Sequence, residues 1–477
     1  NVSLVSSLNE IKTQASSIHE SLDQSKTLAI ELDEKREVYR PFAMKGSVMF
    51  FLIKDMENLS RMYQFSLADF LHIFQGSLQQ YNGDEDLSVK IPTLALMMAQ
   101  RSFLHVSRGL FKEDRVEFAM HVVHGFFPEE FPEHLWNAFI GVTAVSDTAG
   151  IQVPSWATPT ATASYAAAQV ADPQVVANWN LEDPSWASWA REETPEKTLE
   201  ARGMSIIERL MLVSIFRRDR LVAAMTSVVL YKMQLGAMVE VTTIESLVPE
   251  TTPVTPILLI TSAGADPSIE VQEVAYKTIG RNRFTQIALG GGQTDEAMTQ
   301  LRRCASDGEW IFLKNLHLVL DWVSVLEKEV SSMGKPHDDF RLFMTTEAHD
   351  LFPSVLLKSS LKMTFESPPG VKQNMLRSYG SWTPEFLQQL PPLQAQLLFG
   401  LGWFHAILQE RRTYIPQGWV KFYEFTQADL KSACDVILAM SQTGSVDWTT
   451  VQGMLESAVY GGRLDNDQDV KVLQAFI

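Results

Sequence analysis

The residues with the most informative spacing follow a short apolar run. Ile257–Ile260 is typical of a buried strand, and a tight turn follows it closely. The turn consists of Ser262, Ala263, Gly264, Ala265, Asp266, Pro267 and Ser268. Nucleotide-binding folds place a phosphate-binding loop here, with backbone N–H groups and a Lys on the phosphates and a Ser or Thr on magnesium. This turn has no Lys, Asp266 adds negative charge and Pro267 lacks an N–H, so we predict the architecture without the chemistry.

The end of a second predicted strand supports this interpretation. The apolar run Trp310–Leu313 continues into Lys314 and Asn315. P-loop enzymes place an acidic residue for magnesium at this strand end, and Leu313, Lys314 and Asn315 include no carboxylate. A third strand, Phe340–Thr345, runs into the hydroxyls of Thr345 and Thr346, which could resemble a sensor position. The alternative is three core strands of an α/β domain that never bound nucleotide, because short apolar runs before turns are common.

Other candidates for ligand binding are weaker. Gly290-Gly291-Gly292 could cradle a phosphate before a helix, but it lacks G-x-G-x-x-G spacing and a following Lys, which favours a structural turn. Arginines can reach a neighbour's γ-phosphate in ring ATPases, whereas salt bridges between modules are the alternative role for them. The arginines concerned are Arg341, Arg411 and Arg412.

Possible metal ligands lack the partners that a metal site needs. His121 and His124 are three residues apart on a predicted helix near Glu117, without a third and fourth ligand at suitable spacing. Asp465, Asp467 and Asp469 imitate the start of a calcium loop, but Val470 stands where that loop needs Gly. We see no Ser-His-Asp or Cys-His arrangement, so we predict no catalytic, cofactor-binding or metal-binding residue in this chain.

The elements that would position these residues alternate over residues 255–364. Strands and helices follow one another there in the rhythm of a mostly parallel α/β sheet. The predicted elements are Ile257–Ile260, Ile269–Thr278, Thr285–Leu289, Asp295–Ser306, Trp310–Leu313, Trp322–Ser332 and Phe340–Thr345. Residues 382–477 are predicted to be helical. Further helices are expected before the sheet, at Ser47–Leu59, Leu67–Gly76, Lys90–Leu110 and Asp114–His124, and residues 205–236 are also predicted to be helical.

Residues 1–40 carry a heptad seam. Its members are Leu4, Leu8, Ile11, Ala15, Ile18, Leu22, Ala29 and Leu32. No Gly or Pro interrupts the pattern before Pro41, which predicts one helix of a coiled-coil hairpin. The alternative is an amphipathic helix that lies on its own domain.

Residues 144–178 are rich in Ala, Thr, Ser and Pro, a composition that favours an exposed insertion without a stable core. We take the insertion as residues 144–200. Four tryptophans lie in it: Trp156, Trp179, Trp186 and Trp189. They are expected to pin the insertion to the domain surface, and a partner site is the alternative.

Composition limits the possible partners. The chain has 477 residues, with 40 Lys and Arg against 57 Asp and Glu, a net charge of −17 that argues against a nucleic-acid partner. Cys304 and Cys434 cannot form a disulfide framework, which favours a reducing compartment. No run approaches the ~18 apolar residues of a membrane helix, so no membrane partner is expected. The chain begins without Met inside a helical pattern, and we expect it to be part of a larger chain.

Several strings in the same order resemble the motor region of dynein heavy chains. They are Ser262–Pro267, Gly290–Gln293, Trp310–His317, Phe340–Leu342, Phe365–Gly370, Gln409–Arg412, Tyr414–Trp419 and Tyr460–Arg463. The similarity covers nearly the whole chain apart from a stretch near residues 144–200. Leu313–His317 and Ile415–Phe425 look most like the cytoplasmic dynein 2 group, the dyneins of intraflagellar transport.

The resemblance implies four domains. Residues 1–40 would be the strut, or buttress, that leaves the fifth AAA+ module and props the microtubule-binding stalk. Residues 41–110 would be the small helical subdomain of that module. Residues 111–381, with the 144–200 insertion, would be the large α/β subdomain of the sixth AAA+ module, and residues 382–477 its helical lid.

The resemblance also implies a function for the parent chain. The parent would be a minus-end-directed ATPase motor on microtubules in the cytoplasm and cilium, driving retrograde intraflagellar transport. ATP and magnesium would bind other modules, while this segment closes the ring and relays change to the stalk without hydrolysis. Implied partners are the remaining AAA+ modules and stalk, dynein intermediate and light chains, and intraflagellar transport trains. Two alternatives stay open: a regulatory module that binds nucleotide through an atypical loop, and a non-motor scaffold or adaptor.

Overall fold

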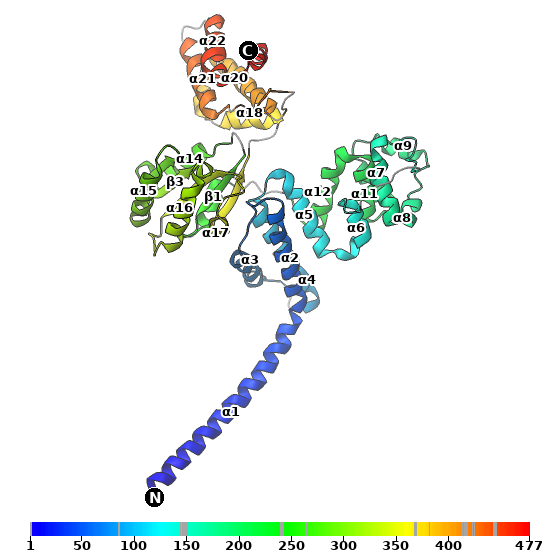
Figure 1. The fold of residues 1–477 in the computed structure, drawn as a ribbon, viewed down its shortest axis with the longest axis vertical. Coiled ribbons are helices and arrows are strands. Elements are labelled where there is room, and N and C mark those ends of the chain that lie inside the picture. The colour runs from blue at the N-terminus through cyan, green and yellow to red at the C-terminus, as the bar shows by residue number, and fades with distance from the viewer. Residues whose placement is uncertain are drawn as a thin grey trace. The chain divides into compact units, whose positions relative to one another are not determined.

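The structure is a computed structural model (Figure 1) that describes residues 2–477, except for 84–85, 144, 146–150, 239–242, 263–264, 367–369, 381, 413, 415–417, 422, 424 and 442–445. The chain is divided into two compact units, Asn1–Val241 and Thr242–Ile477. In the described residues, no helix is both long enough and apolar enough to cross a membrane.

The first unit is built from helices in its described residues. They are α1 (Val2–Val38), α2 (Arg40–Asp55), α3 (Leu67–Gln79), α4 (Leu87–Ser107), α5 (Lys112–Phe126), α6 (Glu133–Phe139), α7 (Thr162–Ala171), α8 (Pro173–Asn178), α9 (Ser185–Trp189), α10 (Pro195–Ala201), α11 (Ile206–Phe216) and α12 (Leu221–Lys232). The three helices expected between residues 45 and 110 are therefore present as α2, α3 and α4.

Helix α1 is continuous over the predicted heptads and is drawn as a long single helix in Figure 1. It ends before Pro41, which enters the first turn of α2, where a missing N–H is tolerated. The helix prediction is confirmed. Ile11, Ile18 and Leu22 are exposed, at 61%, 63% and 45% of their surface, so this part of the seam packs against none of the described chain. The partner helix stays a prediction.

Aromatic side chains fill the core around α2, α4 and α5. Phe42, Phe103 and Phe118 are almost completely buried, and the rings of Phe103 and Phe118 stack at 6.1 Å. Burial of such side chains contributes roughly 1.5–3 kcal/mol each. Helix α2 thus packs against α4 and α5, which follow it later in the chain.

The expectation that residues 144–178 form an exposed insertion without a stable core is wrong for the described residues 151–178, and the ordered structure continues to residue 200. These residues form short helices, and Ala166 and Ala168 of α7 are fully buried because small side chains allow close helix packing. Trp186 and Trp189 are buried as well, with ring centroids 5.2 Å apart. The tryptophans pack on one another and, through Trp156 and Phe216 of α11 with ring centroids 4.8 Å apart, hold the insertion to the domain as predicted. Residues 144 and 146–150 lie outside the described residues.

The second unit begins with a five-stranded sheet. Its strands are β1 (Ile257–Thr261), β2 (Phe284–Ala288), β3 (Trp310–Lys314), β4 (Arg341–Glu347) and β5 (Leu361–Phe365), in the order β2-β3-β4-β1-β5. Every pair is parallel, and Ile257 lies opposite both Phe343 and Leu361. Its helices are α13 (Ile244–Leu247), α14 (Ser268–Thr278), α15 (Thr294–Asp307), α16 (Leu320–Ser332) and α17 (Ser354–Ser359). The α/β prediction is confirmed, and β5 is a strand that the pattern did not predict.

One face of the sheet is the core of this unit. Strand residues two apart share a face, so Trp310 and Phe312 both point toward α13 and α14, where they are 2% and 0% exposed. Ile257, Leu259 and Phe343 join them. Because the strands are parallel, their carboxyl ends meet at one edge, where the candidate residues lie.

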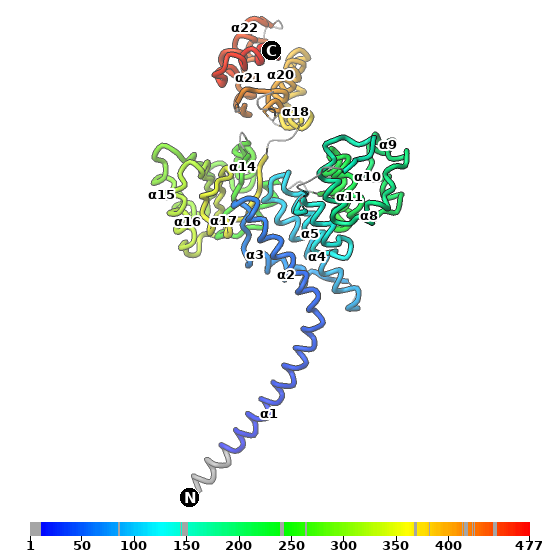
Figure 2. The backbone as a smooth tube through the Cα atoms, turned by 45° about the vertical axis from the view of Figure 1, so that its right-hand side comes forward, coloured from blue at the N-terminus to red at the C-terminus, as the bar shows by residue number. Residues whose placement is uncertain are grey.

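A helical bundle follows β5, and Figure 2 traces its backbone. Its first helix precedes residues 382–477, the range predicted for the lid. Its helices are α18 (Gly370–Gly380), α19 (Pro384–Gln389), α20 (Pro392–Arg411), α21 (Gln427–Met440), α22 (Trp448–Met454) and α23 (Asp467–Phe476). Leu398, Trp419 and Tyr460 are fully buried in its core. The helical prediction for residues 382–477 is confirmed in the described residues.

Candidate functional site

The loop after β1 is tied to its own sheet. The Ser262 N–H donates to the carbonyl oxygen of Phe365 on β5 at 3.0 Å, and the Ala265 N–H donates back to the Ser262 oxygen at 2.9 Å. Ala263 and Gly264 of the predicted loop lie outside the described residues. In the described part of the loop, both of these N–H groups therefore make hydrogen bonds within the protein.

Asp266 lies directly before Pro267, the N-cap of helix α14, and its carboxylate closes the start of that helix. Its Oδ1 accepts the Ser268 N–H at 2.9 Å and the Ser268 hydroxyl at 2.5 Å. A helix N-terminus attracts anions through its N–H groups and its dipole. Here the protein's own carboxylate takes that position, and Pro267 beside it offers no N–H donor. The Ser268 hydroxyl, which would face magnesium in a working loop, donates to Asp266 instead.

The carboxyl end of β3 is closed by hydrogen bonds. The Lys314 carbonyl oxygen accepts the Leu289 N–H at 2.9 Å. Asn315 adopts a left-handed conformation with φ of 62°, and its N–H donates to Thr345 Oγ1 at 3.0 Å. The Thr345 hydroxyl, which the sequence offered as a sensor, therefore binds the neighbouring strand end. Leu313, Lys314 and Asn315 lie at the carboxyl end of β3, and none of their side chains is a carboxylate.

Three residues at this edge were missed as site residues: Thr261, His317 and Glu347. The Glu347 N–H at the end of β4 donates to His317 Nδ1 at 3.1 Å. Thr261 Oγ1 donates to the Thr346 carbonyl oxygen at 3.3 Å. These bonds join the ends of β1, β3 and β4. A usable signal was present, since polar residues that follow parallel strands meet at one edge, and His317 ends one of the strings above.

Arg377 of α18 brings a cation to this edge. Its guanidinium carbon lies 5.6 Å from the centre of the Phe365 ring. Desolvation lowers the pKa of Arg377, and the negative charges of Glu270 and Asp266 oppose that shift. Glu270 keeps exposed surface, yet desolvation by nearby protein raises the pKa of its carboxyl, while the charge of Arg377 lowers it. No sequence pattern pointed to Arg377.

The glycine run forms a turn between β2 and α15. Gly290, Gly291 and Gly292 have φ of 147°, 55° and 88°, a backbone that side chains other than glycine rarely adopt. Asp295 and Glu296 stand in the first turn of α15, where their charge repels a phosphate. The geometry favours the structural turn over an anion site.

The histidine pair packs on an aromatic ring. His124 stacks on Trp136 with ring centroids 4.2 Å apart, and His121 meets the same ring edge-on at 5.6 Å. Desolvation and, secondarily, His121 lower the pKa of His124. Among the described residues, no group of three or more His, Cys, Asp or Glu is arranged to hold a metal.

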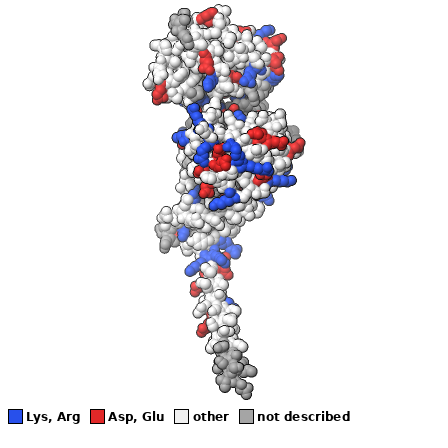
Figure 3. All heavy atoms as spheres, turned by 90° about the vertical axis from the view of Figure 1, so that its left-hand side faces the viewer, with Lys and Arg blue, Asp and Glu red and all other residues white. Residues whose placement is uncertain are grey.

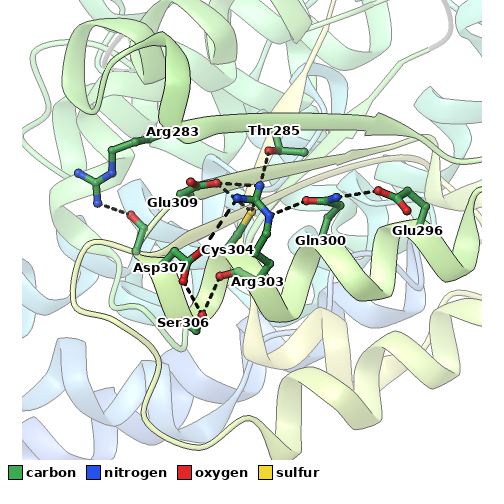
Figure 4. Close-up of polar contacts among 10 residues, drawn as sticks. Arg283, Thr285, Glu296, Gln300, Arg303, Cys304, Ser306, Asp307 and Glu309 are labelled. Carbon is green, nitrogen blue, oxygen red and sulfur yellow. Dashed lines mark hydrogen bonds and ion pairs between the residues drawn. The ribbon is translucent and has the colours of Figure 1, made fainter.

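A group of ion pairs and hydrogen bonds lies at the β2 edge of the sheet (Figure 4). Arg303 of α15 pairs with Glu309 at 2.9 Å and donates to Gln300 at 2.8 Å and to Thr285 at 3.3 Å, which joins α15 to β2 and β3. Burial raises the pKa of the neighbouring Cys304 thiol to about 11, so it stays a thiol. On the face drawn in Figure 3, basic and acidic side chains are interleaved rather than gathered by sign. These contacts are those of a structural network.

Comparison with known protein families shows which family the sequence of this chain is similar to. Residues 252–364 match the model of the dynein heavy chain region D6 P-loop domain, and residues 394–477 match that of the dynein heavy chain AAA lid domain. The chain belongs to the dynein heavy chain family. The two matched ranges fall inside the predicted ranges 111–381 and 382–477. The module boundaries themselves stay predictions.

Individual relatives agree with the family models. The chain is 43% identical over 485 residues to cytoplasmic dynein 2 heavy chain 1 of Chlamydomonas reinhardtii and 39% identical over 495 residues to that of Homo sapiens. It is 28% identical over 500 residues to human dynein axonemal heavy chain 10. Each alignment covers 100% of this chain and 11% of the relative. The chain thus spans about a tenth of the length of these relatives.

The arginine strings of this dynein lid bind its own backbone. Arg411 donates to the Gly418 carbonyl oxygen at 2.9 Å, and its guanidinium lies 5.0 Å from the Phe476 ring centre. Arg412 is only 6% exposed. In the sheet, Arg341 donates to the carbonyl oxygens of Asp338 and Phe340, and desolvation lowers its pKa. These contacts within one subdomain do not favour an arginine that reaches a neighbour's phosphate.

A buried polar network explains the other lid strings. His405 is 1% exposed and contacts the Tyr460 hydroxyl at 3.1 Å and Gln409 Nε2 at 3.1 Å. Gln409 Nε2 also donates to the Phe425 carbonyl oxygen, so the network is satisfied when His405 Nε2 accepts and Nδ1 donates to Tyr460. Desolvation and then the charge of Arg412 lower the pKa of His405 to about 3, so it stays neutral.

The predicted calcium-like aspartates serve the same lid. Asp469 is 1% exposed and accepts the Tyr423 hydroxyl at 2.7 Å and the Val420 N–H at 3.0 Å. Asp465 pairs with Lys421. Both carboxylates join the 418–425 segment to α23. Asp467 lies in the first turn of α23, where a negative charge stabilises the helix dipole.

Proposed function

We propose that this chain is the ring-closing part of a dynein 2-type motor and that it transmits conformational change without binding nucleotide. The observation that carries the proposal is that Asp266 accepts the Ser268 N–H and hydroxyl at the start of α14, which puts a carboxylate where a nucleotide would supply phosphate. The strand end at Leu313–Asn315 lacks a carboxylate for magnesium, which supports the same conclusion.

The parent motor gives this module its role. ATP with magnesium would be hydrolysed in other modules, while the sixth module closes the ring and the strut, residues 1–40, passes its rearrangements to the stalk. The motor would move toward microtubule minus ends and drive retrograde intraflagellar transport in the cytoplasm and cilium. Intermediate and light chains and transport trains would attach through the rest of the heavy chain. The similarity to dynein 2 heavy chains supports this assignment.

A coupling assay on the whole motor tests the proposal. Phe312→Ala removes a fully buried ring from the central strand of the sheet. We expect basal ATP turnover to persist while microtubule stimulation and gliding velocity fall. Val325→Ala, which truncates a side chain that is 51% exposed, is the matched control and should leave both rates unchanged. Loss of basal turnover in a folded variant, with coupling intact, would contradict a purely transmitting module.

A further inference from the structure

The strand β4 keeps its pairing with β1 after its pairing with β3 has ended. In the described chain, the last pair between β3 and β4 is Leu313 with Met344. The ladder of β4 with β1 continues further, to Glu347. Residues 345–347 of β4 are therefore paired as a strand on the β1 side alone. Backbone groups at such a strand end need other hydrogen-bond partners.

Side chains continue the contact where the ladder between β3 and β4 ends. The Asn315 N–H donates to Thr345 Oγ1 at 3.0 Å. Two residues further along both segments, the Glu347 N–H donates to His317 Nδ1 at 3.1 Å. In the first bond the acceptor side chain belongs to β4, and in the second it belongs to the segment that follows β3. The two strand ends are therefore joined from both directions.

Local structure holds both acceptor side chains in place. Asn315 turns the chain in a left-handed conformation, which Asn tolerates better than most residues do. Leu316 is 0% exposed and anchors the short helix Leu316–Val319, which carries His317. Thr345 is itself only 4% exposed. Both acceptors therefore lie on parts of the chain that packing holds in position.

We propose that the Thr345 hydroxyl and the His317 imidazole form a latch that holds the carboxyl end of β3 to that of β4. A P-loop enzyme carries its magnesium carboxylate at the first of these strand ends. In this chain, hydrogen bonds within the protein join the two ends instead. The inference rests on the proposed function, because the latch explains how the sheet can pass on movement as one body without nucleotide.

Hydrogen exchange in the full-length motor tests the latch, because each of its bonds protects one amide. Thr345→Val removes the acceptor hydroxyl at nearly constant shape, and exchange of the Asn315 amide should rise. His317→Phe removes the acceptor nitrogen but keeps an aromatic ring, and exchange of the Glu347 amide should rise. We expect an increase of about three- to tenfold in each case, as the loss of one hydrogen bond predicts. Mass spectrometry with fragmentation to single residues measures it.

Matched variants separate the latch from a general loosening of the fold. His349→Phe makes the same substitution and also removes a bond from an N–H to a histidine Nδ1, but that bond stays within one loop. Thr299→Val removes a hydroxyl that bonds only within its own helix. Neither control should change exchange at the two latch amides. Thr345→Ser keeps the hydroxyl and should keep most of the protection.

The role of the latch in transmission has its own readout. The ratio of microtubule-stimulated to basal ATP turnover should fall in Thr345→Val and in His317→Phe, and it should stay unchanged in His349→Phe and Thr299→Val. Unchanged exchange at both latch amides would overturn the latch. Raised exchange with an unchanged turnover ratio would overturn its role in transmission.

A failure of the proposed function gives a different result. Mg-ATP binding by the unaltered motor region at this edge of the sheet would overturn the proposed function, whatever the exchange of the latch amides. An equal rise of exchange in the latch variants and in both controls would overturn the latch alone. The two failures are therefore distinguishable.

Discussion

The carboxyl edge of the sheet and the interior of the lid use polar groups in opposite ways. At the sheet edge, an exposed carboxylate, Asp266, caps a helix and meets solvent. In the lid, buried groups such as His405 and Asp469 are enclosed by hydrogen bonds. The carboxyl edge of the sheet is where this type of fold would bind a ligand. In this chain, its polar groups make hydrogen bonds within the protein instead. In the lid, the strings that resemble the family belong to the buried, packed interior. A family motif is therefore not by itself a chemical site.

The largest expected effect on stability comes from removing a buried apolar side chain of the sheet. Phe312→Ala should lower the free energy of unfolding of the sheet by ~3–5 kcal/mol, because a fully buried ring is lost and a cavity remains. Urea unfolding followed by hydrogen exchange in β1, β3 and β4 measures the change. A loss below ~1 kcal/mol would mean that the face under α13 and α14 is not the core.

The second effect concerns the buried cap of the lid. Asp429 is 7% exposed, accepts the Thr426 N–H at 2.8 Å and pairs with Arg463 at 2.9 Å. Asp429→Ala should destabilise the lid by ~2–3 kcal/mol, since a capping bond and a charged hydrogen bond are both lost. Thermal unfolding of the chain provides the measurement. A change as small as that of a surface residue would remove the contrast between the two regions.

The third effect is a pH dependence of the lid. The folded pKa of His405 is about 3, below its ordinary value of 6.5, so the unfolded state binds the extra proton between those values. Stability from this group is complete above pH 6.5 and is lost as pH falls toward 3. We expect a loss of ~2 kcal/mol between pH 7 and pH 5 relative to His405→Gln, measured by unfolding at both pH values. Equal pH slopes for the two proteins would contradict a buried neutral histidine.

The smallest effect belongs to the exposed cap at the sheet edge. Asp266→Ala should cost only ~1 kcal/mol, the usual loss for a helix cap. Comparing it with Asp429→Ala in the same unfolding experiment measures the difference between the two regions directly. Equal losses would show that burial does not separate these two capping carboxylates.

Sequence patterns predicted the regular part of this molecule well. The expected strand Ile257–Ile260 differs from β1 by one residue, since an apolar run bounded by turns leaves few alternatives. The strand β5 escaped because Lys362 interrupts its apolar pattern, although that side chain is 3% exposed and donates to the Leu357 carbonyl oxygen. The fold of residues 151–200 escaped because a composition rich in Ala was taken for a weak core, whereas Ala166 and Ala168 pack closely.

The candidate site was predictable where it is local in sequence. Asp266 and Ser268 are two residues apart, so the cap follows from the chain order alone. Arg377 lies more than a hundred residues later, and only the fold brings its guanidinium over the Phe365 ring at the end of β5. His317 and Glu347 meet for a similar reason, because the register of β3 and β4 sets their distance. Such long-range contacts are invisible to local patterns.

Titration with Mg-ATP measures directly whether this chain binds nucleotide. Isothermal calorimetry at high protein concentration, with this chain as a soluble fragment, measures whether the loop at Ser262–Ser268 holds nucleotide. The account predicts no saturable heat, and the same null result for Asp266→Ala, because the Lys and the magnesium carboxylate are absent from the sequence. One-to-one binding at micromolar concentration, abolished by a change in this loop, would contradict it.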